Sequence, residues 1–282
     1  MRSVLAGAVV ALALSAPSAR AAEAVVALQD SGINPYHQVF RDSDPRFLQH
    51  PSTYLPGYPA SAKPLKLTLT GQKDWAAAVK KDCAVWRTVK RGELYYVPGT
   101  RIVGAISFSP QSTITCPAAT GQPPNLDFNG HGTMVASRAV SNAYGGCREC
   151  LVVSVQYPAN ALETEAAYGA LDWLGANTSW IDVESHSWGP LLFGAWDPTD
   201  RAFLVAGGPE LARRSERNAQ RHPAFWASGN GLAGRGGVLG APGTGTAPQI
   251  GPSAFAIGGH DSGQVTAWTG FPPHLVSDAC AS

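Results

Sequence analysis

The sequence predicts an α/β fold, a three-layer doubly wound arrangement in which helices cover both faces of a parallel sheet. Short, continuous apolar runs recur along the chain, as expected for strands that are buried on both faces. Stretches with helical periodicity separate these runs, which is the alternation typical of parallel strands joined by crossover helices. The chain of 282 residues, with 44% hydrophobic and 15% charged residues, is long and apolar enough to bury such a core.

Six apolar runs are the expected strands: residues 24–28, 101–108, 151–155, 181–183, 224–227 and 254–257. Helices are expected at residues 133–142, 163–174 and 209–221. The first is rich in small residues, the second has acidic residues in its first turn, and the third begins with a proline. These assignments place six strands and three helices in one domain.

Residues 41–99 interrupt this alternation, and we interpret them as an insertion. Their first half is Pro-rich and predicts loops, and a short helix is expected around Trp75 to Val79. A basic cluster follows, consisting of Lys80, Lys81, Arg87, Lys90 and Arg91. We expect it to be a solvated face balanced by the nearby acidic residues Asp74, Asp82 and Glu93, although a binding role is the alternative.

The N-terminus has the pattern of a secretory signal peptide over residues 1–21. Arg2 supplies the positive charge, residues 4–14 form an apolar stretch, and Ala19-Arg20-Ala21 offers a cleavage site. The apolar stretch is too short to span a bilayer. We therefore expect a secreted protein whose domain covers residues 22–282. The net charge of +1 gives no reason to expect a nucleic-acid or membrane partner, and we expect a monomer.

Five cysteines are candidates for disulfides in an exported protein, namely Cys83, Cys116, Cys147, Cys150 and Cys280. The pair at 147 and 150 also has the spacing of a redox or zinc site, but no second pair or histidine cluster accompanies it. We therefore expect no metal there, and a small disulfide loop or free thiols instead.

Two motifs carry residues that are suited to proton transfer. Asp30 follows the first expected strand, and the carboxyl ends of parallel strands are where open α/β sheets place their sites. The segment Asn129-Gly130-His131-Gly132-Thr133 places a histidine at the start of a helix. The positive end of the helix dipole is expected to keep this imidazole neutral and able to accept a proton.

Two further motifs follow later strands. Ser187-Trp188-Gly189 comes after the strand at 181–183, and Asn230 comes shortly after the strand at 224–227. A carboxamide at such a strand end can donate a hydrogen bond to a developing oxyanion. The order Asp, His, Ser-Trp-Gly, Gly-Asn resembles that of the subtilisin-like serine peptidases, the subtilases, from about Val25 to the C-terminus.

The resemblance implies a role for each matching residue. Asp30 would orient the histidine, His131 would be the general base and then the general acid, and Asn230 would stabilise the oxyanion. The segment Ser187-Trp188-Gly189 would hold an extended peptide substrate through main-chain pairing. Bound calcium is common in this family, but the resemblance assigns no calcium ligands here, and we expect no other cofactor.

The family's nucleophile lies in a Gly-Thr-Ser-x-Ala-x-Pro-like segment, and no such segment is present. The nearest match, residues 243–248, contains no serine, and Ser253 and Ser282 lie outside any such motif. Residues 255–281 resemble instead the strands that precede the nucleophile. We therefore expect the chain to end before the catalytic serine, with the C-terminal part of the fold incomplete.

Two functions follow from these observations. The first is a secreted serine endopeptidase with an Asp-His-Ser triad whose serine is not in this chain. The alternative is an inactive or fragmentary subtilase-like protein that acts as a peptide-binding module. Other enzyme classes fit poorly. The Gly229–Gly234 match to a dinucleotide-binding loop is not followed by a helix, and the motifs of α/β-hydrolases and zinc metalloproteases are missing.

Overall fold

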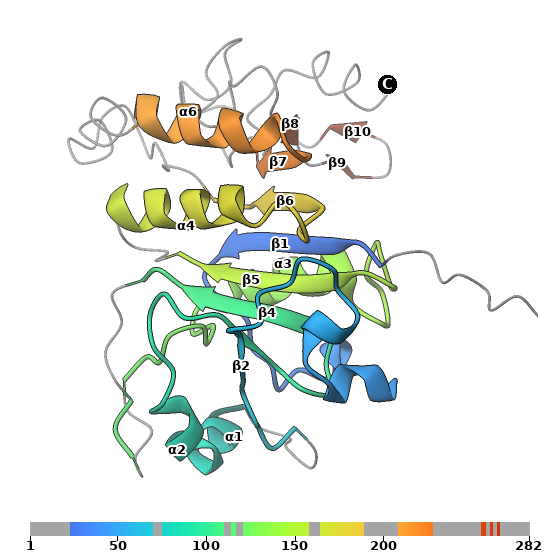
Figure 1. Ribbon diagram of the computed structural model, residues 1–282, viewed down its shortest axis with the longest axis vertical. Coiled ribbons are helices and arrows are strands. Elements are labelled where there is room, and N and C mark those ends of the chain that lie inside the picture. Colours follow the sequence, from blue (N-terminus) through green and yellow to red (C-terminus); the bar gives the residue numbers. More distant parts are fainter. Residues whose placement is uncertain are drawn as a thin grey trace, which may run out of the picture.

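The computed structural model contains a large, mostly parallel sheet (Figure 1). Its strand order is β2-β3-β4-β5-β1-β6-β7-β8. The parallel part consists of β4 (Ile102–Ser107), β5 (Leu151–Gln156), β1 (Val25–Asp30), β6 (Val183–His186), β7 (Ala224–Ala227) and β8 (Phe255–Ile257). The structure describes residues 23–69, 75–109, 114–116, 121–157, 164–188, 208–227, 255–257, 260–261 and 264–265.

Helices cover both faces of the sheet, so the expected three-layer α/β class is confirmed. On one face, Leu28 and Val152 pack with Val140 of α3 (His131–Val140). On the other face, Ala27 and Val153 pack with Leu174 of α4 (Thr164–Ala176). The helix α6 (Gly208–Ala219) lies next to α4. The central strands β5 and β1 are mostly apolar because helices cover both of their faces.

Residues 41–99 form short elements at the β4 edge of the sheet. These are the 3-10 helices η2 (Pro45–Leu48) and η3 (Pro51–Thr53), the strands β2 (Lys63–Pro64) and β3 (Tyr95–Tyr96), and the helices α1 (Trp75–Lys81) and α2 (Cys83–Trp86). A further 3-10 helix, η1 (Gln38–Phe40), precedes them. The strand β3 pairs antiparallel with β4, so this segment extends the sheet. The helix expected around Trp75 is present.

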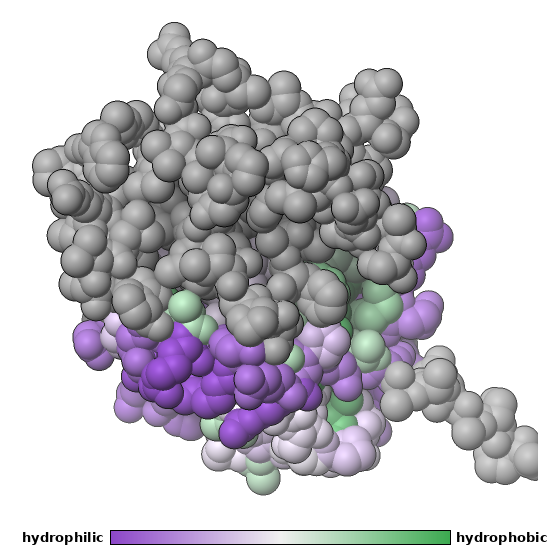
Figure 2. Space-filling model, turned by 90° about the horizontal axis from the view of Figure 1, so that it is seen from above, coloured by the Kyte–Doolittle hydropathy of each residue, from purple (hydrophilic) through white to green (hydrophobic). Residues whose placement is uncertain are grey.

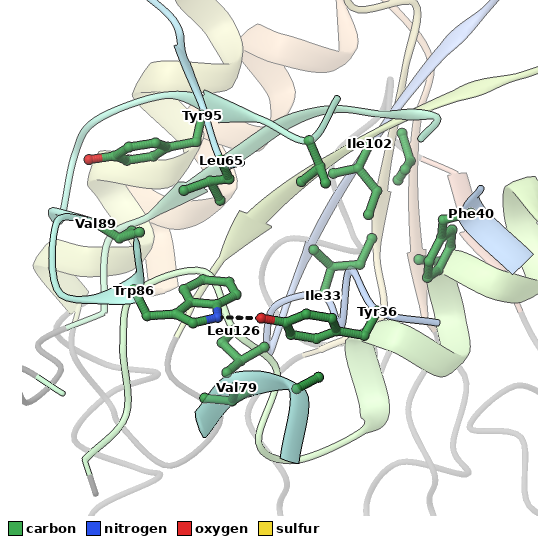
Figure 3. Packing of buried hydrophobic residues seen from close by; sticks show 14 of the residues in the cluster. Ile33, Tyr36, Phe40, Leu65, Val79, Trp86, Val89, Tyr95, Ile102 and Leu126 are labelled. Atoms are coloured by element: carbon green, nitrogen blue, oxygen red, sulfur yellow. Dashed lines mark hydrogen bonds between the residues drawn. The ribbon is translucent and has the colours of Figure 1, made fainter. Parts of the chain in front are cut away.

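The helices α1 and α2 pack over the loop that follows β1. In Figure 3, Val79 and Trp86 face Ile33, Tyr36 and Leu126. The Trp86 indole Nε1 donates a hydrogen bond to the Tyr36 hydroxyl (2.9 Å). This hydroxyl in turn donates to the buried carboxylate of Asp82 (2.9 Å). The inserted segment is therefore fixed to the same loops that surround the ends of β1 and α3.

Two elements differ from the sequence prediction. The expected strand at 181–183 is displaced to Val183–His186, because Ile181 closes the turn after α4 by donating to the Asn177 carbonyl. The helix expected from Thr133 begins at His131. The residues Glu184 and His186 are buried strand residues, although their polarity concealed the strand in the sequence.

Disulfides join Cys83 to Cys116 and Cys147 to Cys150, whereas Cys280 lies outside the described residues. A separate hairpin-like pair is formed by β9 (His260–Asp261) and β10 (Gln264–Val265). Figure 2 shows the molecule from above the view of Figure 1, in which α6 is the uppermost labelled helix. The described residues on this face include a hydrophilic area. Within the described ranges, no helix is long and apolar enough to cross a bilayer.

Candidate active site

The carboxylate of Asp30 and the imidazole of His131 are in direct contact at the carboxyl edge of the sheet. Asp30 is the last residue of β1 and His131 is the first residue of α3. The distance from His131 Nδ1 to Asp30 Oδ1 is 2.8 Å. Asp30 is buried, whereas 44% of the His131 side chain is exposed. The imidazole is therefore held on one side by a buried carboxylate and open to solvent on the other.

A second carboxylate, Asp127, holds the loop that presents His131. Its Oδ1 accepts hydrogen bonds from the backbone of Asn129 (3.0 Å) and Gly130 (2.8 Å). Its Oδ2 accepts from the backbone and the hydroxyl of Thr133 (2.8 and 2.6 Å). These donors include amides of the first turn of α3, which have no partner within the helix. Asp127 thereby caps α3 and fixes the position of His131.

Ser31 links the two carboxylates to the helix. Its hydroxyl donates to Asp127 Oδ1 (2.9 Å) and accepts from the backbone amide of Gly132 (2.9 Å). Its own amide donates to Asp30 Oδ1 (2.7 Å). The loop after β1 and the start of α3 are thus connected through one small side chain.

A glycine is required at position 132 because α3 and the loop after β1 approach closely. A Cβ atom on Gly132 would lie 2.3 Å from the backbone oxygen of Gly32. Gly32 itself has a φ of +120° and is packed against the Gln156 amide, so a side chain is disfavoured there as well. The two glycines bring the Asp30 and His131 side chains within hydrogen-bond distance.

Gln156, at the end of β5, connects this loop to the loop before α3. Its Nε2 donates to the carbonyls of Ser31 (2.9 Å) and Leu126 (3.1 Å). Its Oε1 accepts from the backbone amide of Asn125 (2.7 Å). Gln156 is buried, and its amide satisfies backbone groups that water does not reach.

The pKa of His131 is raised above its ordinary value. The hydrogen bond that His131 donates to Asp30 is the main cause, burial acts against it, and the charges of Asp30 and Asp127 add to it. The helix dipole was expected to help keep the ring neutral, whereas the raised pKa favours the protonated ring. Contact with a carboxylate at 2.8 Å outweighs the partial charge of the helix terminus.

The described part of the Ser187-Trp188-Gly189 segment lies beyond the end of β6. The indole of Trp188 stacks on the ring of Tyr157, at the end of β5, with the ring centroids 4.5 Å apart. It also contacts Trp226 of β7 edge-on, at 5.2 Å. Ser187 and Trp188 are partly exposed. Gly189 and Asn230 lie outside the described residues, so their predicted roles stay predictions.

A buried polar cluster underlies this edge on the α6 side of the sheet. The carboxylate of Glu184 contacts Nε2 of His186 (2.9 Å) and Nε2 of His222 (2.5 Å). Asn218 of α6 donates to the same carboxylate (3.2 Å). The His186 ring lies flat on Trp226, with the centroids 3.9 Å apart. The cluster joins β6, β7 and α6.

Burial alone raises the pKa of Glu184, but the hydrogen bonds from His186 and His222 outweigh it and hold the pKa at about 2. Glu184 is therefore an ionised carboxylate in the interior, stabilised by two imidazoles. His186 precedes the Ser187-Trp188-Gly189 segment, so the sequence allows either a role beside a substrate pocket or a structural role. Its buried position places it in the core.

Several residues that build the site escaped the sequence analysis. Asp127 and Gln156 are single polar residues without a motif of their own. A signal for Asp127 did exist, since an aspartate shortly before a helix is a common N-terminal hydrogen-bond acceptor. Among the described residues, no cluster of three or more histidine, cysteine, aspartate or glutamate side chains could hold a metal ion.

Comparison with known families gives one match. The model of the subtilase family matches residues 21–280, which is nearly the whole chain. No curated protein matches the chain at a significant level.

Proposed function

The chain belongs to the subtilase family of serine peptidases, and on this premise we propose that Asp30 and His131 are the carboxylate and the base of an Asp-His-Ser triad that hydrolyses peptide bonds. The observation that carries the proposal is the 2.8 Å contact between Asp30 Oδ1 and His131 Nδ1. Both residues also stand where the family motifs place the corresponding groups.

The contact determines which ring nitrogen is the base. With Nδ1–H donating to Asp30, the lone pair of His131 lies on Nε2, which can take a proton from a serine hydroxyl. The imidazolium that results is stabilised by Asp30 and by the nearby charge of Asp127. The raised pKa of His131 is consistent with this stabilisation. Nε2 would then return the proton to the leaving amine.

We propose that the peptide substrate lies along Ser187-Trp188-Gly189 and that Asn230 donates to the oxyanion. The parallel pairing of β1 with β6, and of β6 with β7, supports this assignment. It places the ends of these three strands at the same edge as Asp30. The Tyr157–Trp188 stack would then form an aromatic wall beside the substrate.

We assign no nucleophile within residues 1–282, because no serine of this sequence lies in the family's nucleophile motif. The second candidate function is therefore a peptide-binding module without hydrolytic activity. The absence of that motif is the observation that favours it.

A fluorophosphonate probe tests whether a serine of this chain is the nucleophile. We expect the purified 282-residue chain to be unlabelled and to release no fragments from labelled casein. Labelling that is lost in His131→Ala but retained in the distant control His50→Ala would show that a serine of this chain is the nucleophile. Such labelling would contradict our conclusion that residues 1–282 contain no nucleophile. Binding of extended peptides without cleavage would support the peptide-binding function.

We further propose that the protein is exported and that residues 1–21 are its signal peptide. The disulfides Cys83–Cys116 and Cys147–Cys150 support an oxidising compartment. Expression with the complete N-terminus should yield an extracytoplasmic product that begins at Ala22. A cytoplasmic product with reduced cysteines and an intact Met1 or Arg2 terminus would contradict export.

A further inference from the structure

The inserted segment carries a basic surface whose side chains form no ion pair among the residues that the structure describes. This surface, defined as Lys80, Lys81, Arg87, Lys90 and Arg91, consists of five exposed side chains. None of them takes part in the ion pairs found within the described ranges. Unpaired cations at this density produce a local positive potential.

Two of the three acidic residues expected to balance this surface have other partners. Asp82 is buried and accepts hydrogen bonds from Tyr36 and from the amide and hydroxyl of Thr68. Glu93 pairs with Lys63 at 2.8 Å and accepts from the Tyr95 hydroxyl at 2.6 Å. Asp74 lies outside the described residues. The expectation of a balanced face therefore fails for Asp82. The pKa of Glu93 is lowered mainly by its hydrogen bond to Lys63, and of the five cations only Lys90 contributes to it.

Positive charge is concentrated in one segment of the chain. Residues 63–93 contain eight basic and three acidic side chains, although the net charge of the whole chain is only +1. The rest of the chain is therefore net acidic. A solubilising surface does not require such a division, whereas recognition of an acidic partner does.

The helix α1, which carries Lys80 and Lys81, contacts the loop before α3. Trp75, the first residue of α1, is 41% exposed and meets the Phe128 ring edge-on at a centroid distance of 5.6 Å. Phe128 directly follows Asp127, the residue that caps the His131 helix. The Cys83–Cys116 disulfide and the Asp82–Tyr36 hydrogen bond fix the segment in this place.

We propose that this surface selects acidic polypeptides as substrates or ligands. An acidic stretch of the peptide would contact the five cations while the neighbouring stretch crosses the Trp75–Phe128 pair toward His131. The proposal rests on the proposed peptide-binding function of the Asp30–His131 edge. A polypeptide is the occupant because α1, which carries two of the cations, contacts the loop before His131 through Trp75 and Phe128.

Binding of three labelled peptides of equal length tests the proposal by fluorescence anisotropy. One peptide carries glutamates in one half, one carries glutamines at those positions, and one carries lysines. We expect the purified chain to bind the glutamate peptide about tenfold more tightly than the glutamine peptide at low salt. This preference should shrink in 0.5 M NaCl because added salt screens exposed charges.

Two charge-matched variants locate the effect. K80E/K81E should abolish the preference and leave the affinity for the glutamine peptide unchanged. The control R148E/R213E changes the net charge equally at exposed sites outside the segment and should keep the preference. An unchanged preference in K80E/K81E, or an equal loss in the control, would overturn the proposal.

The glutamine peptide separates this inference from the proposed function. If no variant binds the glutamine peptide, the peptide-binding edge itself is wrong. If an oligonucleotide with the same number of charges competes as well as the glutamate peptide, the surface is a general polyanion site, and the proposal is also overturned. If the chain binds both the glutamate and the glutamine peptide, and prefers the glutamate peptide in a salt-sensitive way, the result supports both this inference and the proposed peptide-binding function.

Discussion

At the residue scale, the Asp30 carboxylate controls the protonation of His131. The two side chains come from opposite ends of the β1-to-α3 connection, and Gly32 and Gly132 allow their approach. The imidazole is more basic than a free histidine because it donates to an anion. The Asp30 side chain therefore raises the pKa of the imidazole that would transfer the proton.

Replacement of Asp30 by asparagine should lower the pKa of His131. The amide keeps the shape of the side chain but removes the charge that favours the imidazolium. Titration of the histidine ring resonances by NMR measures the shift. Asp172→Asn, which changes an exposed carboxylate on α4, is the control and should leave the His131 titration unchanged. Equal titration curves for the wild type and Asp30→Asn would contradict the assigned contact.

Glu184 contributes stability that depends on pH. Its folded-state pKa of about 2 lies below the ordinary value of 4.5, so the ionised form stabilises the fold at neutral pH. That contribution is complete above about pH 5 and falls as the pH drops toward 2.

Replacement of Glu184 by glutamine should lower the free energy of unfolding at pH 7 by about 1–3 kcal/mol. The amide group would point a donor at one of the two imidazole Nε2–H groups. Urea denaturation at pH 7 and pH 3 measures the effect, and the gap between the wild type and the variant should narrow at pH 3. A gap that is constant with pH would show that packing, and not the charge of Glu184, is responsible.

At the scale of elements, α3 depends on the close approach of its first turn to the loop after β1. Gly132→Ala should lower the free energy of unfolding by about 1–3 kcal/mol, because the added methyl meets the Gly32 carbonyl. Gly146→Ala is the matched control, since its new Cβ would meet no atom closer than 3.8 Å. Thermal or urea unfolding of the two variants gives the comparison. Equal stability of the two variants would contradict the close contact between Gly132 and the Gly32 carbonyl.

The elements show which parts of the fold the sequence can predict. The run 224–227 matches β7 to the residue, and the helix expected at 163–174 is close to α4, because continuous apolar runs and acidic first turns are local signals. The position of β6 was not predicted correctly because the contacts that allow Glu184 to be buried include Asn218 of α6 and His222, which lie far along the chain. β2 and β3 are too short to leave a periodic pattern.

The same distinction applies to the candidate site. Asp30 and His131 stand in recognisable motifs, and their contact follows once β1 and α3 meet at one edge of the sheet. Asp127 and Gln156 act on backbone groups of distant loops. Such contacts depend on tertiary structure, so a single sequence does not display them.

At the scale of the whole molecule, the two disulfides should contribute unequally to stability. Cys83–Cys116 spans 33 positions and Cys147–Cys150 spans 3. Because a longer closed loop restricts the unfolded chain more, we expect losses of about 4 kcal/mol for C83S/C116S and about 2 kcal/mol for C147S/C150S. Urea unfolding of the two double variants measures the difference. A larger loss in the second variant would contradict the chain-entropy explanation.

The position of β1 has a consequence for how the chain reaches its native state. This strand is the first to be synthesised, yet it lies between β5 and β6, and the Val25 amide donates to Asp182, which is 157 residues away. The middle of the sheet therefore stays incomplete until a ribosome has released both later strands. A topology with such distant pairings folds slowly. We expect nascent chains that end before residue 186 to remain open to proteolysis, with protection arising abruptly once β6 has emerged.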